Sequence, residues 1–132
     1  MLIETDILLA VASKEDEYHD EAVNLLGRKG LKLSPYSLLE LDLLIKSGVL
    51  DVDIELFYKG LSELLKYYGI RITLPSPLHM VKAWYLRRKY EMTYFDSLHA
   101  SVAILEGIPI VSYDEGYSKV EGLVYIPPSA VR

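Results

Sequence analysis

Cysteine and glutamine are absent from the 132-residue sequence, and asparagine occurs only once, at Asn24. Without cysteine the chain has neither disulfides nor thiolate ligands for zinc, so any bound metal must be held by carboxylates or histidines. The shortage of amide side chains resembles the depletion of thermolabile residues in proteins from hot environments. Acidic side chains are therefore the first candidates for a functional site.

Long apolar runs are also missing. The uninterrupted hydrophobic stretches are far too short for a membrane-spanning helix, and the first residues show neither a basic flank nor a cleavage site. We expect a cytoplasmic protein without membrane contact. With 51% hydrophobic residues, the length suits one domain over residues 1–132 that builds its own core.

A net charge of −5 argues against broad affinity for nucleic acids, because phosphate binding usually depends on lysine and arginine. The basic residues are not spread evenly, however. One run comprises Lys82, Arg87, Arg88 and Lys89, and a second comprises Arg28, Lys29 and Lys32. They are either solvated helix ends or contacts for the flanks of a nucleic-acid strand whose centre is neutralised by a metal.

Short apolar strands alternate with longer amphipathic helices, a pattern typical of an α/β fold with a parallel sheet covered on both faces. The predicted strands are Leu2–Glu4, Leu31–Ser34, Ile70–Leu74, Pro109–Ser112 and Leu123–Ile126. The predicted helices are Asp6–Ala12, His19–Arg28, Tyr36–Lys46, Ile54–Tyr68, Pro77–Tyr90 and Asp96–Glu106. Glycines after several of these helices, and prolines in first turns, favour the same boundaries.

Four acidic residues occupy comparable places in this pattern. Asp96 opens a predicted helix, Asp114 follows the fourth strand, Glu4 ends the first strand, and Glu40 lies in the leucine-rich helix. In parallel α/β folds, ligands bind outside the carboxyl ends of the strands. We therefore expect these carboxylates to converge at one edge of the sheet.

Such a cluster needs a cation or protons, because two unit charges about 4 Å apart repel by about 4 kcal/mol at an effective dielectric near 20. Oxygen ligands favour Mg²⁺ or Mn²⁺, which keep several waters and can carry a substrate phosphate. The pattern points to metal-assisted hydrolysis of phosphodiesters.

Each candidate also has a purely structural explanation. Thr5, Asp6 and Asp96 suit helix N-caps, and His99 suits a hydrogen-bonded structural histidine. Asp6 also lies two residues beyond Glu4, so both side chains can face one metal if the segment is extended. Glu40 sits on a helix that is apolar around most of its circumference, which predicts a buried helix; its carboxylate then either has a partner or borders a polar cleft.

Asp42 differs from Glu40 by roughly 200° around the same helix and is expected to face solvent. Ser112 lies two residues before Asp114 on the same side of its strand, where it can support the outer shell of a metal.

The residues together resemble the PIN domain, in particular the VapC-type toxin ribonucleases of toxin–antitoxin pairs. The strongest match is DSLHASVAILEGIPIVSYDEGY, which contains the family's helix acid and histidine, the Gly-x-Pro, and a strand ending in Ser-x-Asp with an aromatic three residues later. SLLEL resembles the segment around the second acid, with Ser37 three residues before Glu40. IETDILLA resembles the opening strand and turn, with Thr5 and Asp6 in the expected places.

The resemblance implies a three-layer α/β/α fold with a central parallel five-stranded sheet, the acids meeting between adjacent first and fourth strands. It implies a divalent-metal-dependent endoribonuclease that uses Mg²⁺ or Mn²⁺, binds an antitoxin protein and forms a homodimer. The implied catalytic residues are Glu4, Glu40, Asp96 and Asp114, the metal ligands are the same four acids with Asp6, and the supporting residues are Thr5, Ser37, His99 and Ser112. Tyr94, Tyr113 and Tyr117 flank the site and either stack on bases or cover apolar surface.

One position departs from the family pattern, because Glu4 stands where the family usually has aspartate. The longer side chain shifts the carboxylate outward, so either Asp6 replaces it as a ligand or catalysis is lost and a module that binds protein or RNA remains.

Two other phosphate-handling classes fit less well. Haloacid-dehalogenase-type phosphatases need Asp-x-Asp after the first strand, and receiver domains need an acceptor aspartate after the third, where Pro75–Pro77 stands.

Overall fold

A sheet of five short parallel strands forms the centre of the computed structural model, which describes residues 1–131. The strand order is β3-β2-β1-β4-β5. The strands are β1 (Leu2–Ile3), β2 (Lys32–Leu33), β3 (Arg71–Ile72), β4 (Ile110–Val111) and β5 (Tyr125–Ile126), and all neighbouring pairs are parallel. The predicted number, order of appearance and direction of the strands are confirmed, although each strand is shorter than predicted.

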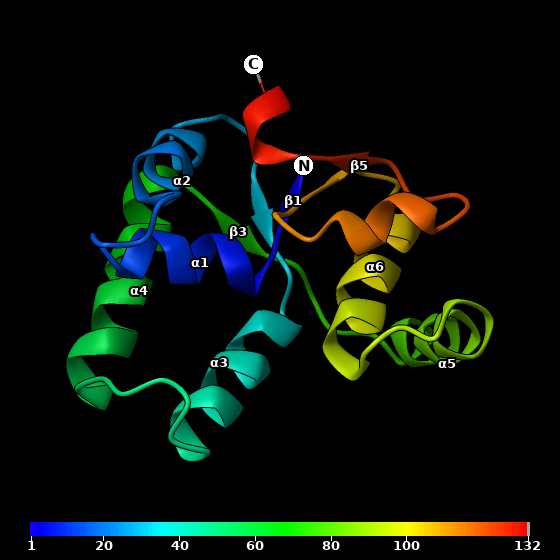
Figure 1. The fold of residues 1–132 in the computed structure, drawn as a ribbon, viewed down its shortest axis with the longest axis horizontal. Coiled ribbons are helices and arrows are strands. Elements are labelled where there is room, and N and C mark those ends of the chain that lie inside the picture. The colour runs from blue at the N-terminus through cyan, green and yellow to red at the C-terminus, as the bar shows by residue number, and fades with distance from the viewer. Residues whose placement is uncertain (132) are drawn as a thin grey trace.

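Six helices pack around the sheet and cover both of its faces (Figure 1), which confirms the three-layer α/β/α fold. They are α1 (Thr5–Ala12), α2 (His19–Leu26), α3 (Tyr36–Lys46), α4 (Ile54–Tyr68), α5 (Pro77–Tyr90) and α6 (Tyr94–Glu106). Figure 1 shows α1, α2 and α4 on one side of the sheet and α5 and α6 on the other. Two 3₁₀ helices, Glu115–Lys119 and Pro128–Ala130, were not predicted from the sequence.

Two hydrophobic clusters hold these layers together, one on each face of the sheet. Adjacent residues of a strand point to opposite faces, so Leu2 packs among side chains of α5 and α6 while Ile3 packs among those of α1, α2 and α4. Ile110 and Val111 divide in the same way. The two central strands β1 and β4 are buried on both faces, so their residues are continuously apolar, whereas β2 and β3 nearer the sheet margin contain Lys32 and Arg71.

Two helices have N-cap residues that differ from the predicted ones. Glu4, rather than Thr5 or Asp6, is the N-cap of α1, and its side chain accepts a hydrogen bond from the backbone N–H of Asp6. Helix α6 begins two residues earlier than predicted, because the Thr93 hydroxyl caps it by accepting from the N–H of Asp96. Asp96 therefore lies in the first turn, where its carboxylate is free for other contacts.

Helix α3 is less buried than its leucine-rich sequence suggests. Leu41 is fully buried, but Leu39 and Leu43 on the opposite side are 57% and 53% exposed. In Figure 1 the helix extends from the sheet edge with only one side towards the domain. The predicted burial of the whole helix was wrong, and an apolar surface remains on its outer side.

Candidate active site

The candidate site lies at the carboxyl end of the sheet, where three strands end side by side. Ile3 pairs with Leu33 on one side and with Val111 on the other, so the next residues are Glu4, Ser34 and Ser112. Helices α3 and α6 approach this edge and contribute further polar groups. The parallel pairing of β1 with β4 thereby brings together residues more than a hundred positions apart.

Glu4 lies at the centre of the site and is 4% exposed. One oxygen accepts from the backbone N–H of Asp6 at 3.0 Å, and the other accepts from the Tyr117 hydroxyl at 3.1 Å. Burial raises the pKa of Glu4 well above its ordinary value, and the nearby Asp6 carboxylate raises it further. A neighbouring cation would favour the charged form of this carboxylate.

Glu40 reaches the site from the second turn of α3. Its Oε1 accepts hydrogen bonds from the Thr5 hydroxyl and from Nε2 of His99, the latter at 2.9 Å. Burial by itself raises the pKa of Glu40, but the donors on His99 and Thr5 outweigh it, and the pKa lies below its ordinary value. Asp42, two residues further, is exposed and accepts from the Tyr58 hydroxyl, as its predicted solvent-facing position requires.

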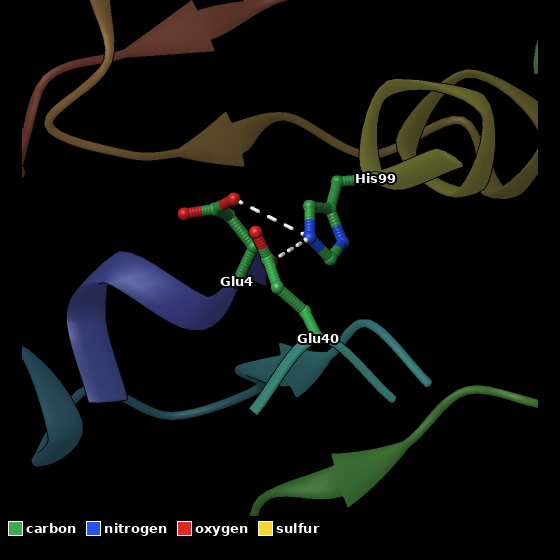
Figure 2. A group of neighbouring side chains, drawn as sticks. All are labelled: Glu4, Glu40 and His99. Carbon is green, nitrogen blue, oxygen red and sulfur yellow. Dashed lines mark hydrogen bonds and ion pairs between the residues drawn. The ribbon is translucent and has the colours of Figure 1, made fainter. Parts of the chain in front are cut away.

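His99 joins the two glutamates (Figure 2). Its Nε2 lies 2.9 Å from Glu40 Oε1 and 3.5 Å from Glu4 Oε2, and its Nδ1 lies 2.7 Å from the Ser34 hydroxyl. Because ionised carboxylates only accept hydrogen bonds, the network places a proton on Nε2. The fully buried ring thus acts as a donor that orients the glutamates, in agreement with the prediction of a hydrogen-bonded structural histidine.

Asp96 and Asp114 complete the acidic edge of the site. Asp114 follows β4, and its Oδ1 accepts from the N–H of Gly116 at 2.8 Å, while its own N–H donates to the Ser112 hydroxyl at 3.0 Å. Burial raises the pKa of Asp96; the contact with Thr93 opposes this shift, and the charge of Asp114 adds to it. These two aspartates meet at one edge of the sheet, as their positions in the sequence predict.

Asp6 ties the start of α1 to the end of β4. Its Oδ2 accepts from the Ser112 hydroxyl at 2.6 Å and from the N–H of Tyr113 at 2.7 Å. Its Oδ1 is buried and has no hydrogen-bond partner among residues 1–131. One oxygen of Asp6 is therefore structural, and the other keeps its full capacity to bind a cation or a water molecule.

A single cavity of about 140 Å³ joins these groups. The five acids predicted as metal ligands all line it; the complete lining is Glu4, Thr5, Asp6, Leu9, Glu40, Leu44, Asp96 and Asp114. His99 and Ser112 stand behind this lining and hold its carboxylates. Ser37 is buried three residues before Glu40, but it does not line the cavity, and its hydroxyl has no partner within residues 1–131.

Two residues in the site were not predicted in their actual roles. Tyr117 is 1% exposed, and its hydroxyl lies 3.1 Å from Glu4 and 3.3 Å from Asp96. Of the two predicted alternatives for its ring, base stacking is excluded, and the ring packs against apolar side chains. Ser34 holds Nδ1 of His99 and was not predicted at all. Its place directly after the second strand, level with Glu4, is the sequence feature that could have identified it.

The donor set fits a hard divalent cation. Single ligand atoms of Glu4, Glu40 and His99 lie within 4.8 Å of one another, and Asp6 adds a buried oxygen without a partner. Magnesium and manganese prefer carboxylate oxygens and water, and a positive ion would offset the cost of the buried Glu4 charge. Since His99 Nε2 already donates to Glu40, the carboxylates are better placed than the histidine to bind the ion.

Comparison with known proteins identifies the family. Residues 1–123 match the family model of the PIN domain, which covers most of the chain. The chain belongs to the PIN domain family, and the resemblance observed in its sequence is confirmed. No curated protein sequence matches it.

Solved toxin–antitoxin structures share the fold. A chain of the VapBC2 complex of Rickettsia felis, bound to a DNA fragment from its promoter, is similar with a TM-score of 0.73, 20% identity and 96% of each chain covered. A chain of FitAcB from Neisseria gonorrhoeae has a TM-score of 0.73 and 14% identity, with 98% of this chain and 99% of that chain covered. The Mycobacterium tuberculosis toxin VapC20, described as cleaving the sarcin-ricin loop, has a TM-score of 0.66 and 21% identity over 89% and 92% of the two chains.

A separate feature concerns membranes. Among the helices of the described residues, none combines the length and the apolar character needed to cross a bilayer.

Proposed function

We propose that this protein is a divalent-metal-dependent endoribonuclease, and that it is the toxin of a toxin–antitoxin pair. The observation that carries the proposal is the convergence of five carboxylates from four separate parts of the chain on one cavity of about 140 Å³. So many acids in one small space are tolerable only with a cation or bound protons. Membership of the PIN family and the toxin structures of the same fold support the choice of RNA as the substrate.

In this proposal Glu4, Glu40, Asp96 and Asp114 hold one or two Mg²⁺ or Mn²⁺ ions directly or through water, and Asp6 contributes its unpaired oxygen. The ion, when bound, lowers the pKa of an attacking water and stabilises charge on the phosphate. The protein's own part is to fix the carboxylates. His99 and Thr5 orient Glu40, Tyr117 orients Glu4, and Ser112 orients Asp6.

The decisive experiment measures metal-dependent cleavage of mixed RNA by the wild type and by paired variants. Glu40→Gln and Asp42→Asn change neighbouring acids on α3, one lining the cavity and the other exposed. We expect Glu40→Gln, Asp96→Asn and Asp114→Asn to lose cleavage by at least about a hundredfold, and Asp42→Asn to retain it. Normal cleavage by folded Asp96→Asn and Asp114→Asn proteins would refute the mechanism.

The toxin assignment has its own test. The solved structures similar to this chain include a toxin–antitoxin complex from Klebsiella pneumoniae. An apolar groove of about 330 Å³ between α1 and α4, lined by residues such as Leu8, Phe57 and Leu64, suits a partner segment. We expect production of the wild type in a bacterial host to arrest growth and production of Asp96→Asn to allow it. Equal growth with both proteins, at equal soluble levels, would contradict a toxin role.

The homodimer is also part of the proposal. Exposed Leu39 and Leu43 on α3 leave apolar surface that a second copy would cover. Sedimentation at micromolar concentration should give about twice the 15.0 kDa mass of the chain. A monomer under these conditions would exclude the dimer without affecting the cleavage mechanism.

One observation favours the alternative of a catalytically weak or inactive binding module. Both oxygens of Glu4 already accept hydrogen bonds, from the N–H of Asp6 and from Tyr117. A metal must therefore share or displace these donors. Absence of cleavage and of Mn²⁺ binding by the well-folded wild type would favour this alternative.

A further inference from the structure

An exposed group of aromatic and basic side chains lies beside the acidic cavity, on α5 and at the start of α6. We define the aromatic ledge as Trp84, Arg87, Arg88 and Tyr94. Trp84 and Tyr94 are each 57% exposed. The Arg87 guanidinium lies over both rings, 5.2 Å from the centroid of Trp84 and 4.5 Å from that of Tyr94, and Arg88 lies 5.5 Å from Trp84.

The ledge is held in place by a buried serine. Arg87 Nε donates to the Ser97 hydroxyl at 2.7 Å, and that hydroxyl donates to the backbone carbonyl of Tyr94 at 2.6 Å. Ser97 is fully buried on α6, so it fixes Arg87 and the backbone of Tyr94 to the domain. A surface arranged before binding loses less conformational entropy when a ligand arrives.

The ledge is also connected to the acidic site. The ring of Tyr94 lies 5.2 Å from that of Phe95, and Phe95 lies 6.4 Å from the ring of His99. A second cleft of about 170 Å³ shares Asp96 and Asp114 with the acidic cavity and reaches Thr93 at the start of α6; Glu91 and Lys119 also line it. A ligand held at the acids can therefore continue over the start of α6.

The charge and the aromatic side chains of the ledge indicate which class of ligand it binds. No carboxylate oxygen of residues 1–131 lies within 4.0 Å of a guanidinium nitrogen of Arg87 or Arg88, whereas nearby Lys89 is paired with Glu121 at 3.6 Å. In a protein of net charge −5, the ledge combines positive charge without acidic partners and two aromatic side chains that are more than half exposed. Single-stranded nucleic acid offers both complements, phosphates for the guanidinium groups and unpaired bases for the rings.

We infer that the aromatic ledge binds the single-stranded RNA next to the bond that is cut, with bases stacked on Tyr94 and Trp84 and phosphates held by Arg87 and Arg88. Within the described chain the second basic run differs, since Lys32 is paired with Glu106 at 3.7 Å and Arg28 shares a separate cavity with Glu21. The inference rests on the proposed ribonuclease function, and it specifies a strand with accessible bases as the substrate at that site.

The chain contains one tryptophan, and it lies on the ledge, so binding can be measured without cleavage. Short single-stranded RNA of mixed sequence is titrated into the protein in EDTA while Trp84 fluorescence is recorded. We expect saturable quenching that weakens as salt is raised, and none with a perfectly paired duplex of the same length.

Two tyrosine variants test the ledge itself. Tyr94→Leu should weaken RNA binding by about 5- to 150-fold, the range expected for the loss of one stacked base. Tyr67→Leu is the matched control, because Tyr67 is 82% exposed on α4, away from the site. In cleavage assays Tyr94→Leu should raise KM and leave kcat nearly unchanged, because stacking outside the reacting bond contributes equally to ground and transition states.

The outcomes separate the two proposals. Cleavage by the wild type without quenching, or quenching that Tyr94→Leu leaves unchanged, would overturn the ledge and leave the ribonuclease intact. Quenching without cleavage in Mn²⁺ would overturn the ribonuclease and leave the ledge. A dimer in sedimentation that dissociates in Trp84→Glu, together with absent quenching, would assign the ledge to self-association and also overturn the inference.

Discussion

The Tyr117 hydroxyl donates to the Glu4 carboxylate across 113 positions of sequence, at a distance of 3.1 Å. Burial raises the pKa of Tyr117, so the hydroxyl stays protonated and remains a donor. Its second neighbour is Asp96, at 3.3 Å. One phenol thereby lies between two carboxylates, Glu4 at the N-cap of α1 and Asp96 in the first turn of α6.

Removing this hydroxyl should loosen the site. Tyr117→Phe leaves the buried Glu4 with one donor fewer, so we expect a loss of about 1–3 kcal/mol in the free energy of unfolding and slower RNA cleavage. Urea denaturation measures the first effect. Tyr58→Phe is the control, because it removes a solvent-exposed hydroxyl that contacts Asp42. Equal stability losses in the two variants would refute a special role for Tyr117.

The buried charge of Glu4 should cost stability when no metal is bound. The pKa of Glu4 is higher in the folded than in the unfolded protein. Its favourable contribution to the free energy of unfolding is therefore complete below the unfolded pKa, about 4.3, and is lost as pH rises through the pKa of the folded protein. Glu4→Gln should therefore raise the Tm of the protein in EDTA at neutral pH, by about 2–8 °C for each 1 kcal/mol gained. Towards pH values below the unfolded pKa the difference should disappear.

Manganese should have the opposite effect on the difference in Tm between the wild type and Glu4→Gln. Ion binding offsets the Glu4 charge, so Mn²⁺ should raise the Tm of the wild type more than that of Glu4→Gln. Glu63→Gln, an exposed position on α4, serves as the control and should follow the wild type. A wild-type Tm that does not respond to Mn²⁺ or Mg²⁺ would contradict a cation site at these acids.

Thr5 should stabilise the ionised form of Glu40. Because the pKa of Glu40 is lowered in the folded protein, its contribution to the free energy of unfolding is present above the unfolded pKa. That contribution is lost as pH falls through the pKa of the folded protein. Thr5→Val removes one donor and should cost about 1.5–3 kcal/mol at neutral pH, and less in acid where Glu40 is neutral. Thr5→Ser keeps the hydroxyl and should behave like the wild type in pH-dependent denaturation. A pH-independent loss in Thr5→Val would indicate a packing effect instead.

Gly116 should control the position of Asp114. A Cβ atom at residue 116 would lie 2.9 Å from Asp114 Oδ1, closer than real contacts allow. Gly116→Ala should therefore displace the Asp114 carboxylate and reduce cleavage, while the fold tolerates the added methyl group in this half-buried 3₁₀ turn. Gly60→Ala is a suitable control, since the added atom meets nothing within 4 Å. Full activity of Gly116→Ala would show that the position of Asp114 is not critical.

Much of this molecule could be predicted from its sequence, because its strongest patterns are local. Alternation of short apolar strands with amphipathic helices predicts the parallel sheet, and α3, α4 and α5 have the predicted boundaries. Helical geometry separates Glu40, which lines the cavity, from Asp42, which is exposed, as predicted from their spacing. The roles of the acids as ligands stay predictions.

The predictions that differ from the structure concern residues whose positions depend on tertiary contacts. The threonine cap moved the start of α6, so Asp96 is not a cap. A 3₁₀ turn at Glu115–Lys119 directs Tyr117 inward, which decides between the two alternatives that its place beside Asp114 left open. The leucines of α3 indicated burial on all sides, but sequence cannot show that only one side of a helix at a sheet edge meets the core.

The pairing of β1 with β4 has a consequence for the order in which the protein is made. A chain synthesised from its first residue contains Glu4 and Glu40 long before it contains Asp96, Asp114 and Tyr117. The central strand must wait for its second neighbour, since Leu2 and Ile3 pair with Ile110 and Val111. A nascent chain on the ribosome therefore lacks the complete acidic site until Asp114 and Tyr117 have been translated.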